Sequence, residues 1–455
     1  MKRILLAVLL LAVLLYGCAE REPAYITVGE ETYPADISRL DLRDRAMTAA
    51  EYEQLRTALP ECEILWRVPF QGQYLESDAR ELSLASLTLE ELETLAYFPD
   101  LENIQIRSFP GSAVLEALSA AAPECTVRYF VPIGGRNHSV YARHLTLSWE
   151  ALSRDGELLA WLPELTDVTL SDTVTDLDAM ASLMEEYPDV RFHFTFSLFD
   201  RELSNAAAEV DLSGIAMESV EAVEAALSLF HGLERLILCD TGLPSEELDA
   251  LWKRHPEIRV IWNVKIGYSW LRTDTTTFMP FKLGFDGLEG IEMTDRYMTE
   301  LKYLVDVVCM DLGHQGMTNI EFVRNMPNLK YLIIADSPVK DLSPLEGLKN
   351  LEYLEAFMNH ITDISPLAGC TGLRDVNLCY NDITDISPLL ELPHLENIWL
   401  SSNWGVPDEQ RQQVKDTFPD AKIVFMTRSS TGEGWRELPR YYEQRALLGM
   451  GIMYG

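Results

Sequence analysis

The C-terminal half of the chain places apolar residues in a pattern that repeats every 22 residues. The segments LKYLII, LEYLEA, LRDVNL and LENIWL begin at Leu329, Leu351, Leu373 and Leu395, and a related segment upstream starts at Val307. The alternation of apolar and polar positions in each segment predicts a short strand with one face in a core and the other toward solvent. Because one such coil cannot bury its apolar edge alone, the repetition predicts a stack of coils that share one core.

The rest of each 22-residue unit predicts a turn followed by a single helical turn. The phrase Asn-x-Ile-Thr-Asp-Ile-Ser-Pro-Leu starts at Asn359 and again at Asn381. An asparagine side chain directly after a strand can hydrogen-bond the backbone as the chain turns, so we expect a ladder formed by Asn359, Asn381 and Asn403. The Ser-Pro pairs that follow suit the start of a helical turn on the outer side. The repeated residues are therefore predicted to be scaffold, and the candidates for function are residues that differ between repeats.

The N-terminal half repeats with a longer and looser period, marked by a Pro-Glu or Pro-Asp pair before a strand-like segment. The pair occurs at Pro60, Pro123, Pro188 and Pro256, at intervals of 63, 65 and 68 residues. Each interval holds two further strand-like segments, such as ELSL and LENIQI, with helix start signals between strands. Three coils per unit follow, and the chain is predicted to form one curved solenoid of on the order of 18 to 19 coils.

The 22-residue segments and their Ile-x-Asp-Ile-Ser-Pro-Leu phrase resemble leucine-rich repeats, in particular the bacterial subtype seen in internalins. The resemblance implies an α/β fold, a leucine-rich-repeat solenoid shaped as a curved horseshoe. Parallel strands would line its concave face, and helices or 3-10 turns would lie on its convex face. Solenoids commonly bind their ligands on the concave face.

The N-terminus predicts export. Two basic residues precede an apolar run over 4–16, which is the pattern of a secretory signal. The run ends in LYGC, which resembles a bacterial lipobox and predicts lipidation at Cys18. The chain is therefore expected outside the cytoplasm, held to the bacterial membrane only through this lipid. An ordinary signal peptide cut elsewhere stays open as an alternative, whereas a spanning helix is disfavoured because it needs roughly 20 apolar residues.

These patterns divide the chain into six predicted segments. They are a signal peptide at 1–17, a tether at 18–35, longer irregular repeats at 36–271, a joint or irregular insertion at 272–292, 22-residue-type repeats with a C-terminal coil at 293–427, and an off-register tail at 428–455. The tail resembles the tails of other bacterial leucine-rich-repeat lipoproteins and is interpreted as a possible C-terminal cap.

Composition excludes several classes of partner. Asp and Glu number 72 against 37 Lys and Arg, a net charge of −35, which disfavours binding to nucleic acid or to anionic lipid headgroups. We expect a monomer. The six cysteines after Cys18 are interpreted as free thiols, although a pair between Cys370 and Cys379 is left open.

No motif for catalysis is found. The chain lacks a glycine-rich phosphate loop, a Gly-x-Ser-x-Gly nucleophile and a His-Glu-x-x-His metal motif, and its eight histidines lie far apart. We therefore predict no enzymatic activity, no cofactor and no metal.

The candidate site is the concave face of the 22-residue repeats, meaning the strand positions that do not point into the core. Exposed aromatic residues beside a few carboxylates are typical of a protein-binding patch, so an unknown protein ligand is predicted. One alternative is a carbohydrate ligand held by the same aromatics, and another is that the aromatics pack on one another or under the tail. The predicted residues are Tyr331, Ile333, Tyr353, Glu355, Phe357, Asp375, Asn377, Asn397 and Trp399, with Tyr380 one step beyond its strand.

Overall fold

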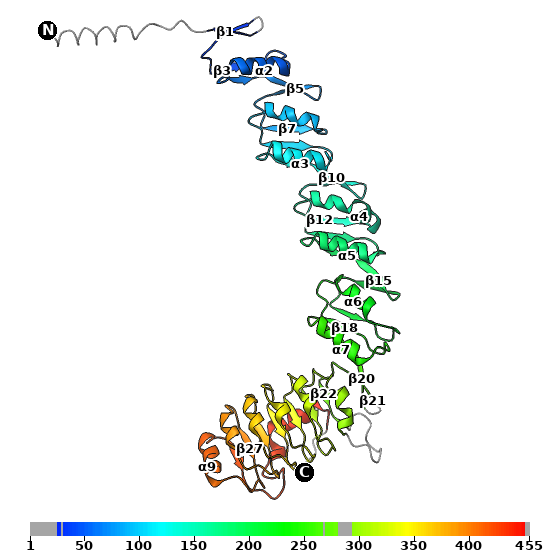
Figure 1. The fold of residues 1–455 in the computed structure, drawn as a ribbon, viewed down its shortest axis with the longest axis vertical. Coiled ribbons are helices and arrows are strands. Elements are labelled where there is room, and N and C mark those ends of the chain that lie inside the picture. Colours follow the sequence, from blue (N-terminus) through cyan, green and yellow to red (C-terminus); the bar gives the residue numbers. More distant parts are fainter. Residues whose placement is uncertain (1–24, 29–30, 267–268, 281–293, 451–455) are drawn as a thin grey trace, which may run out of the picture. The chain divides into compact units, whose positions relative to one another are not determined.

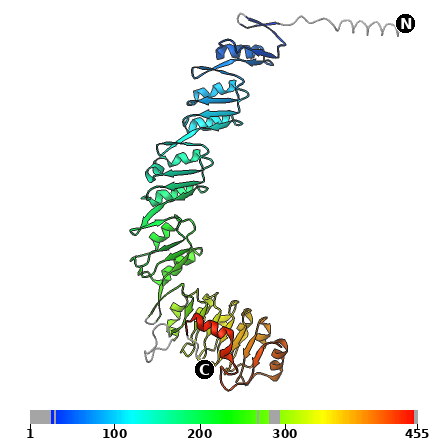
Figure 2. The ribbon, with the colours of Figure 1, turned by 180° about the vertical axis from the view of Figure 1, so that it is seen from behind.

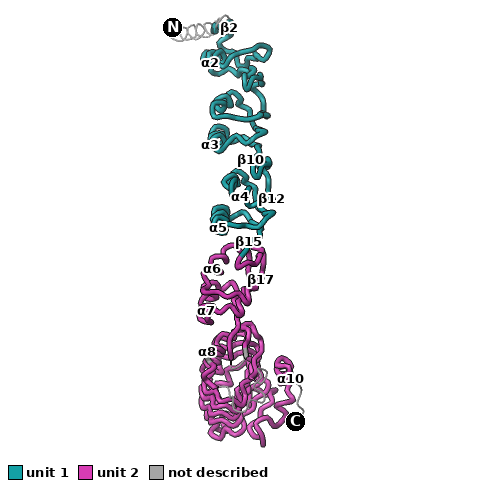
Figure 3. Tube along the Cα trace, turned by 90° about the vertical axis from the view of Figure 1, so that its right-hand side faces the viewer, with its two compact units in different colours: residues 1–197 teal, residues 198–455 magenta. Residues whose placement is uncertain are grey.

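The computed structural model describes residues 25–28, 31–266, 269–280 and 294–450, in two compact units that cover 1–197 and 198–455 (Figures 1 and 3). The predicted signal peptide and Cys18 lie outside the described residues. Each unit is described by itself below.

The N-terminal unit begins with a hairpin that the sequence analysis assigned to a tether. Strand β1 (Tyr25–Val28) pairs antiparallel with β2 (Glu31–Pro34), and Tyr33 is buried against the core of the first coil, with Ile26 and Val28 packed beside it. The tether assignment is therefore wrong from Tyr25 onward, because these apolar side chains cover the end of the core. The coil that follows contains β3 (Arg39–Asp41), α2 (Ala49–Ala58) and β4 (Glu63–Leu65).

Two three-stranded parallel sheets follow in this unit. The first contains β7 (Glu81–Leu84), η1 (Glu90–Tyr97), β8 (Asn103–Ile106), α3 (Ser112–Ala121) and β9 (Thr126–Arg128). The second contains β12 (His144–Leu147), α4 (Trp149–Asp155), η2 (Gly156–Trp161), β13 (Asp167–Leu170), α5 (Leu177–Glu186) and β14 (Arg191–His193). Each of these two sheets thus contains three parallel strands.

Antiparallel hairpins separate these sheets. They are β5 (Arg67–Phe70) with β6 (Gln73–Glu76), and β10 (Phe130–Ile133) with β11 (Arg136–Ser139). Their turns, Gln71–Gly72 and Gly134–Gly135, have positive φ at both positions, which is the geometry of tight hairpin turns. The solenoid of this unit is therefore divided into short parallel sheets, because β4 and β9 each run into a hairpin instead of another coil.

The C-terminal unit starts with the last long repeat. Strand β15 (Thr195–Leu198) contains the division between the two units. The repeat itself contains β16 (Arg201–Ser204), β17 (Glu209–Asp211), α6 (Glu221–Leu227), β18 (Arg235–Ile237), α7 (Ser245–Arg254), β19 (Arg259–Ile261), β20 (Asn263–Ile266) and β21 (Ser269–Arg272). Its core continues into that of the 22-residue repeats, from Val210 to Val414, so the two predicted repeat regions share one core in this unit.

A seven-stranded parallel sheet follows, with 3-10 helices or short α-helices between most successive strands (Figure 1). The strands are β22 (Thr277–Phe278), β23 (Cys309–Asp311), β24 (Tyr331–Ile333), β25 (Tyr353–Glu355), β26 (Asp375–Asn377), β27 (Asn397–Trp399) and β28 (Lys422–Val424). The helices are η4 (Asp295–Tyr297), α8 (Met298–Leu301), η5 (Glu321–Asn325), η6 (Ser343–Leu345), η7 (Ser365–Gly369), η8 (Ser387–Glu391), α9 (Asp408–Thr417), η9 (Trp435–Glu437) and α10 (Pro439–Leu447).

The strands confirm the predicted register, since Tyr331, Tyr353, Asp375 and Asn397 are direct partners across four strands. Strand β22 lies inside the segment predicted as a joint, 272–292, so that segment supplies the first strand of the sheet. Residues 281–293 of the joint lie outside the described residues. Across the described part of the chain, 18 strands lie in parallel sheets, which agrees with the predicted number of coils.

The three asparagines that follow the strands are linked to adjacent coils by hydrogen bonds. The Nδ2 group of Asn381 donates to the carbonyls of Ala356 (2.9 Å) and Leu378 (3.0 Å), while its Oδ1 accepts from the backbone N–H of Ile361 (3.1 Å). Asn403 makes the same contacts one coil later. Asn359 donates in the same way one coil earlier, but its Oδ1 accepts from the backbone N–H of Ser337. Each side chain thus satisfies buried backbone groups of two adjacent coils.

We expect Asn381→Ala to lower the free energy of unfolding of the C-terminal unit by about 3 kcal/mol, because it leaves several buried backbone groups without partners. Urea denaturation followed by circular dichroism would measure the loss. The control, Thr362→Ala at an exposed position of the same coil, should change stability by less than about 0.5 kcal/mol. Equal effects of the two substitutions would contradict the role given to the ladder.

Candidate binding face and the segment that covers it

The predicted concave-face residues lie together on one side of the seven-stranded sheet. Strands β24 to β27 each contribute two of them, and the partners across neighbouring strands align, for example Ile333 with Glu355 and Asn377 with Trp399. Phe357 and Tyr380 follow the ends of β25 and β26. The repeat register therefore brings these side chains together as the sequence predicts.

These residues are, however, covered by the chain itself. The tail, residues 428–450, carries η9 and α10 and lies over this face, and its Trp435, Leu438 and Tyr441 form one apolar cluster with the aromatic residues of the strands (Figure 2). Figure 3 shows α10 on the side of the unit opposite α8. Asn397 and Tyr380 are half-buried, and the other predicted residues are buried, namely Tyr331, Ile333, Tyr353, Glu355, Phe357, Asp375, Asn377 and Trp399.

The expectation of a solvent-exposed concave face is therefore not met, and the alternative that its aromatics lie under the tail describes the structure. The tail covers the face of the sheet, whereas a cap on the last coil would cover the end of the core. The function of the concave-face residues in binding a partner stays a prediction.

Trp435 is the centre of the contact between the tail and the sheet. Its side chain is 0% exposed, and its ring lies 5.3 Å from that of Tyr353 and 5.1 Å from that of Trp399, measured between centroids. Its Nε1–H donates a hydrogen bond of 2.8 Å to Oε1 of Glu355, which also accepts from the hydroxyl of Tyr353. The indole is thus held by ring packing and by a directed hydrogen bond.

A charged contact lies beside this aromatic centre. Nη1 of Arg440 is 2.9 Å from Oδ1 of Asp375 and 2.9 Å from Oε2 of Glu396. Asp375 is fully buried, and its Oδ1 also accepts from Nδ2 of Asn397 at 2.7 Å, but its Oδ2 has no hydrogen-bond partner. A buried carboxylate of this kind depends on its cation, because removal of one partner leaves an uncompensated charge.

Polar side chains of the sheet also bind the backbone of the tail. Nδ2 of Asn377 donates to the carbonyl of Ser430 at 2.9 Å, and Nε1 of Trp399 donates to the carbonyl of Gly432 at 2.9 Å. At the other end, the hydroxyl of Tyr331 contacts Glu443 at 2.7 Å. The face therefore contacts the main chain of the tail as well as its side chains.

Burial changes the protonation of the two acidic residues of the face. It raises the pKa of Glu355 above its ordinary value and raises that of Asp375, although hydrogen bonds from Tyr353 and Asn397 oppose these shifts. The pKa of Glu396, at the edge of the contact, is lowered by its hydrogen bond with Arg440. The carboxyl groups of Glu355 and Asp375 thus hold their protons to higher pH under the tail than they would if they were exposed to solvent.

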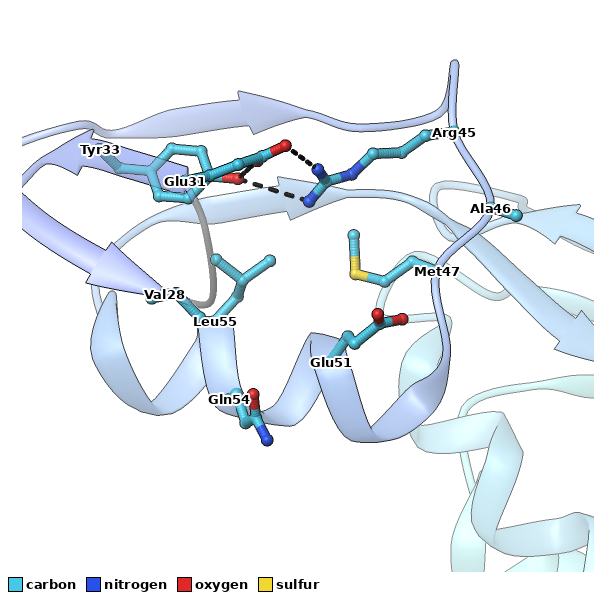
Figure 4. Close-up of a pocket in the computed structure, with 9 residues that line it drawn as sticks. All are labelled: Val28, Glu31, Tyr33, Arg45, Ala46, Met47, Glu51, Gln54 and Leu55. Atoms are coloured by element: carbon cyan, nitrogen blue, oxygen red, sulfur yellow. Dashed lines mark hydrogen bonds and ion pairs between the residues drawn. The ribbon is translucent and has the colours of Figure 1, made fainter.

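A pocket of about 230 Å³ lies between the β1–β2 hairpin and α2 (Figure 4). Arg45 bonds Glu31 and Tyr33 there, and Glu51 caps the start of α2 through Thr48. Because these polar groups are used within the protein, the pocket is a weaker candidate site than the concave face.

The described residues offer little for other chemistry. No group of three or more His, Cys, Asp or Glu among them could hold a metal ion. The six described cysteines are free thiols, as predicted, and burial raises the pKa of Cys370 and Cys379 to about 12. None of the described helices has the length and apolar character needed to cross a bilayer.

Comparisons with known proteins gave one family match and several similar solved structures. The family model for leucine-rich repeats (two copies) matches residues 327–369. Among solved structures, an internalin of Listeria monocytogenes is 17% identical over 84% of this chain and 89% of its own, with a TM-score of 0.28. Internalin C2 of the same organism is 25% identical over 55% and 77% of the two chains, with a TM-score of 0.21.

A leucine-rich-repeat protein of Leptospira interrogans is 15% identical over 77% of this chain and 96% of its own, with a TM-score of 0.28. A search of curated proteins gave no match. The family match and the parallel strands in 22-residue register show that the fold is a leucine-rich-repeat solenoid.

We expect Trp435→Ala to weaken docking of the tail by about 3–5 kcal/mol, because a fully buried indole and its hydrogen bond are lost. Amide hydrogen exchange in α10 should then become faster, while exchange in β24 to β27 remains slow at their core-facing positions. Trp404→Ala is the matched control, since that indole is 81% exposed. Unchanged exchange in α10 of the Trp435 variant would contradict the central place given to this residue.

The stability of the covered face should also depend on pH through Glu355. Because its pKa is raised in the folded protein above the ordinary value of 4.5, the folded state binds this proton more tightly than the unfolded state. Its contribution to stability therefore falls as pH rises from 4.5 through the raised pKa. Glu355→Gln, which keeps an oxygen acceptor for Trp435, should gain stability relative to wild type over this window in urea denaturation at several pH values. A constant difference would be inconsistent with this titration.

Proposed function

We propose that this chain is an exported, lipid-anchored leucine-rich-repeat protein that binds another protein through the concave face of its 22-residue repeats. The observation that carries this proposal is that the face already holds a polypeptide, the tail, by ring packing, ion pairing and hydrogen bonds to the main chain. The means of recognition are therefore those of a protein-binding surface.

The composition of the face supports this proposal further. Binding energy at protein interfaces is concentrated in a few central Trp, Tyr and Arg residues from which water is excluded. Tyr353 and Trp399 have no exposed surface, and the polar residues Asn397 and Glu396 lie at the edge of the contact. A partner that replaces the tail would find the same arrangement.

The alternative of a carbohydrate ligand is less well supported. A sugar ring stacks on an open aromatic face, whereas the rings of Tyr353 and Trp399 pack against Trp435 at 33° and 64°. The face also contributes donors placed for main-chain carbonyls, from Asn377 and Trp399. Both features favour a polypeptide.

The proposed anchor is Cys18. Six residues, 19–24, separate it from β1, and an extended chain of that length spans at most about 20 Å. A lipid on Cys18 would thus hold the β1–β2 hairpin close to the bilayer, and the lipid would be the only membrane contact required.

The binding proposal is tested by capture of partners on immobilised protein from cell-surface extracts. Intact protein should capture little, and Trp435→Ala/Arg440→Ala, which loosens the tail, should capture at least tenfold more of a specific partner. Adding Tyr353→Ala and Asn377→Ala should abolish this gain, whereas adding the control Trp404→Ala should not.

Folding of each variant is checked by its cooperative urea transition. If the variants with an altered face captured the same partner as strongly as the loosened protein, the concave face would not be the binding site.

A further inference from the structure

The tail can leave the sheet without disturbing the core of the coils. The interior core of the C-terminal unit includes no residue beyond Val414 in its buried part, whereas the buried residues of the tail belong to a separate cluster on the other face of the sheet. The tail also adds no strand, because the sheet ends at β28. Its release therefore breaks no strand pairing of the sheet.

The contact also contains polar groups that the tail leaves unsatisfied. Oδ2 of Asp375, on the sheet, and Oε1 of Gln444, on α10, are buried without a hydrogen-bond partner. Arg440 reaches Asp375 through a single nitrogen, Nη1, and only to Oδ1. Because a buried oxygen without a hydrogen-bond partner is destabilising, an occupant that satisfied both carboxylate oxygens would bind better than the tail does.

The chemistry of a better occupant follows from these contacts. The aromatic centre between Tyr353 and Trp399 accepts an indole whose N–H can reach Glu355. Asp375 and Glu396 require a cation, and a guanidinium presents two parallel N–H groups that match both oxygens of a carboxylate. The chain's net charge of −35 adds a general attraction for a basic segment.

We propose that the tail is a built-in competitor for the ligand, and that the ligand is a basic polypeptide segment carrying a tryptophan and, five positions later, an arginine. This inference rests on the proposed function, whose site it specifies. The spacing is that of Trp435 and Arg440 in the tail. Because a tethered segment acts at an effective concentration of order millimolar, only a partner with better pairing at Asp375 displaces it.

The test uses the full chain with a protease site inserted after Met426. Cleavage leaves the tail bound without a covalent link, and a fluorescent peptide of residues 428–450 is then added in excess. We expect the peptide to exchange into the face, as measured by fluorescence anisotropy. Peptides with Trp435→Ala or Arg440→Ala should bind more than tenfold more weakly than the unaltered peptide.

The matched control is the Arg436→Ala peptide, which loses the same charge from an exposed position and should bind within about twofold of the unaltered peptide. An Asp375→Asn variant of the cleaved protein should show a smaller difference in affinity between the unaltered and the Arg440→Ala peptides, because only Glu396 then pairs with Arg440 at close range. Circular dichroism of the cleaved protein checks that the coils remain folded.

The outcomes separate this inference from the proposed function. If the folded, cleaved protein never exchanged its tail, the tail would be a permanent part of the structure and the inference would fail. If all peptides exchanged equally, the face would still bind polypeptide but the assigned tryptophan and arginine chemistry would be wrong. If the peptides behaved as expected but capture of partners did not depend on the face, only the proposed function would fail.

Discussion

The structure depends on one constraint, which is that no 22-residue coil can bury its own apolar edge. Each coil must align its strand with the next so that Leu332, Leu354, Val376 and Ile398 form one interior, and the fully paired register of β24 to β27 is the result. The asparagine ladder follows from the same requirement. Backbone groups that turn out of each strand lie too deep for water, so a side chain must satisfy them.

Stacking of the coils also creates the opposite face, and there the residues are free to vary. The positions that face away from the core carry aromatic and acidic side chains. The aromatic side chains would form an apolar patch that is unfavourable to leave exposed to water. The tail resolves this in the structure by forming a second cluster around Trp435. The C-terminal unit thus has two cores of different character. One is mainly aliphatic and repeated, and the other is mainly aromatic, lies beside charged groups and is completed by a segment that occurs once.

The long repeats of the N-terminal unit show what happens when stacking is interrupted. The chain turns into a hairpin at Gln71–Gly72 after the two strands β3 and β4, and at Gly134–Gly135 after the three strands β7 to β9, and each time the next sheet begins anew. Trp66 lies between β4 and the first hairpin, and its backbone N–H donates to the hydroxyl of Ser77 beyond the hairpin, which holds the hairpin against the end of β4. Such sheets are short, so no extended concave face of seven strands forms in that unit.

The sequence by itself determined the strands, their register and the asparagine ladder, because these are repeated locally and each copy has the same neighbours one period away. It also contains the turn residues of the hairpins, Gln71–Gly72 and Gly134–Gly135, which the repeat pattern does not predict. Only the tertiary structure decided whether the concave face is exposed to solvent or covered. Whether Tyr353 and Trp399 meet solvent depends on Trp435 and Arg440, which lie outside the repeat and carry no periodic signal. Their docking is a long-range contact that depends on the shape of the folded sheet. Such a contact produces no periodic pattern in the local sequence.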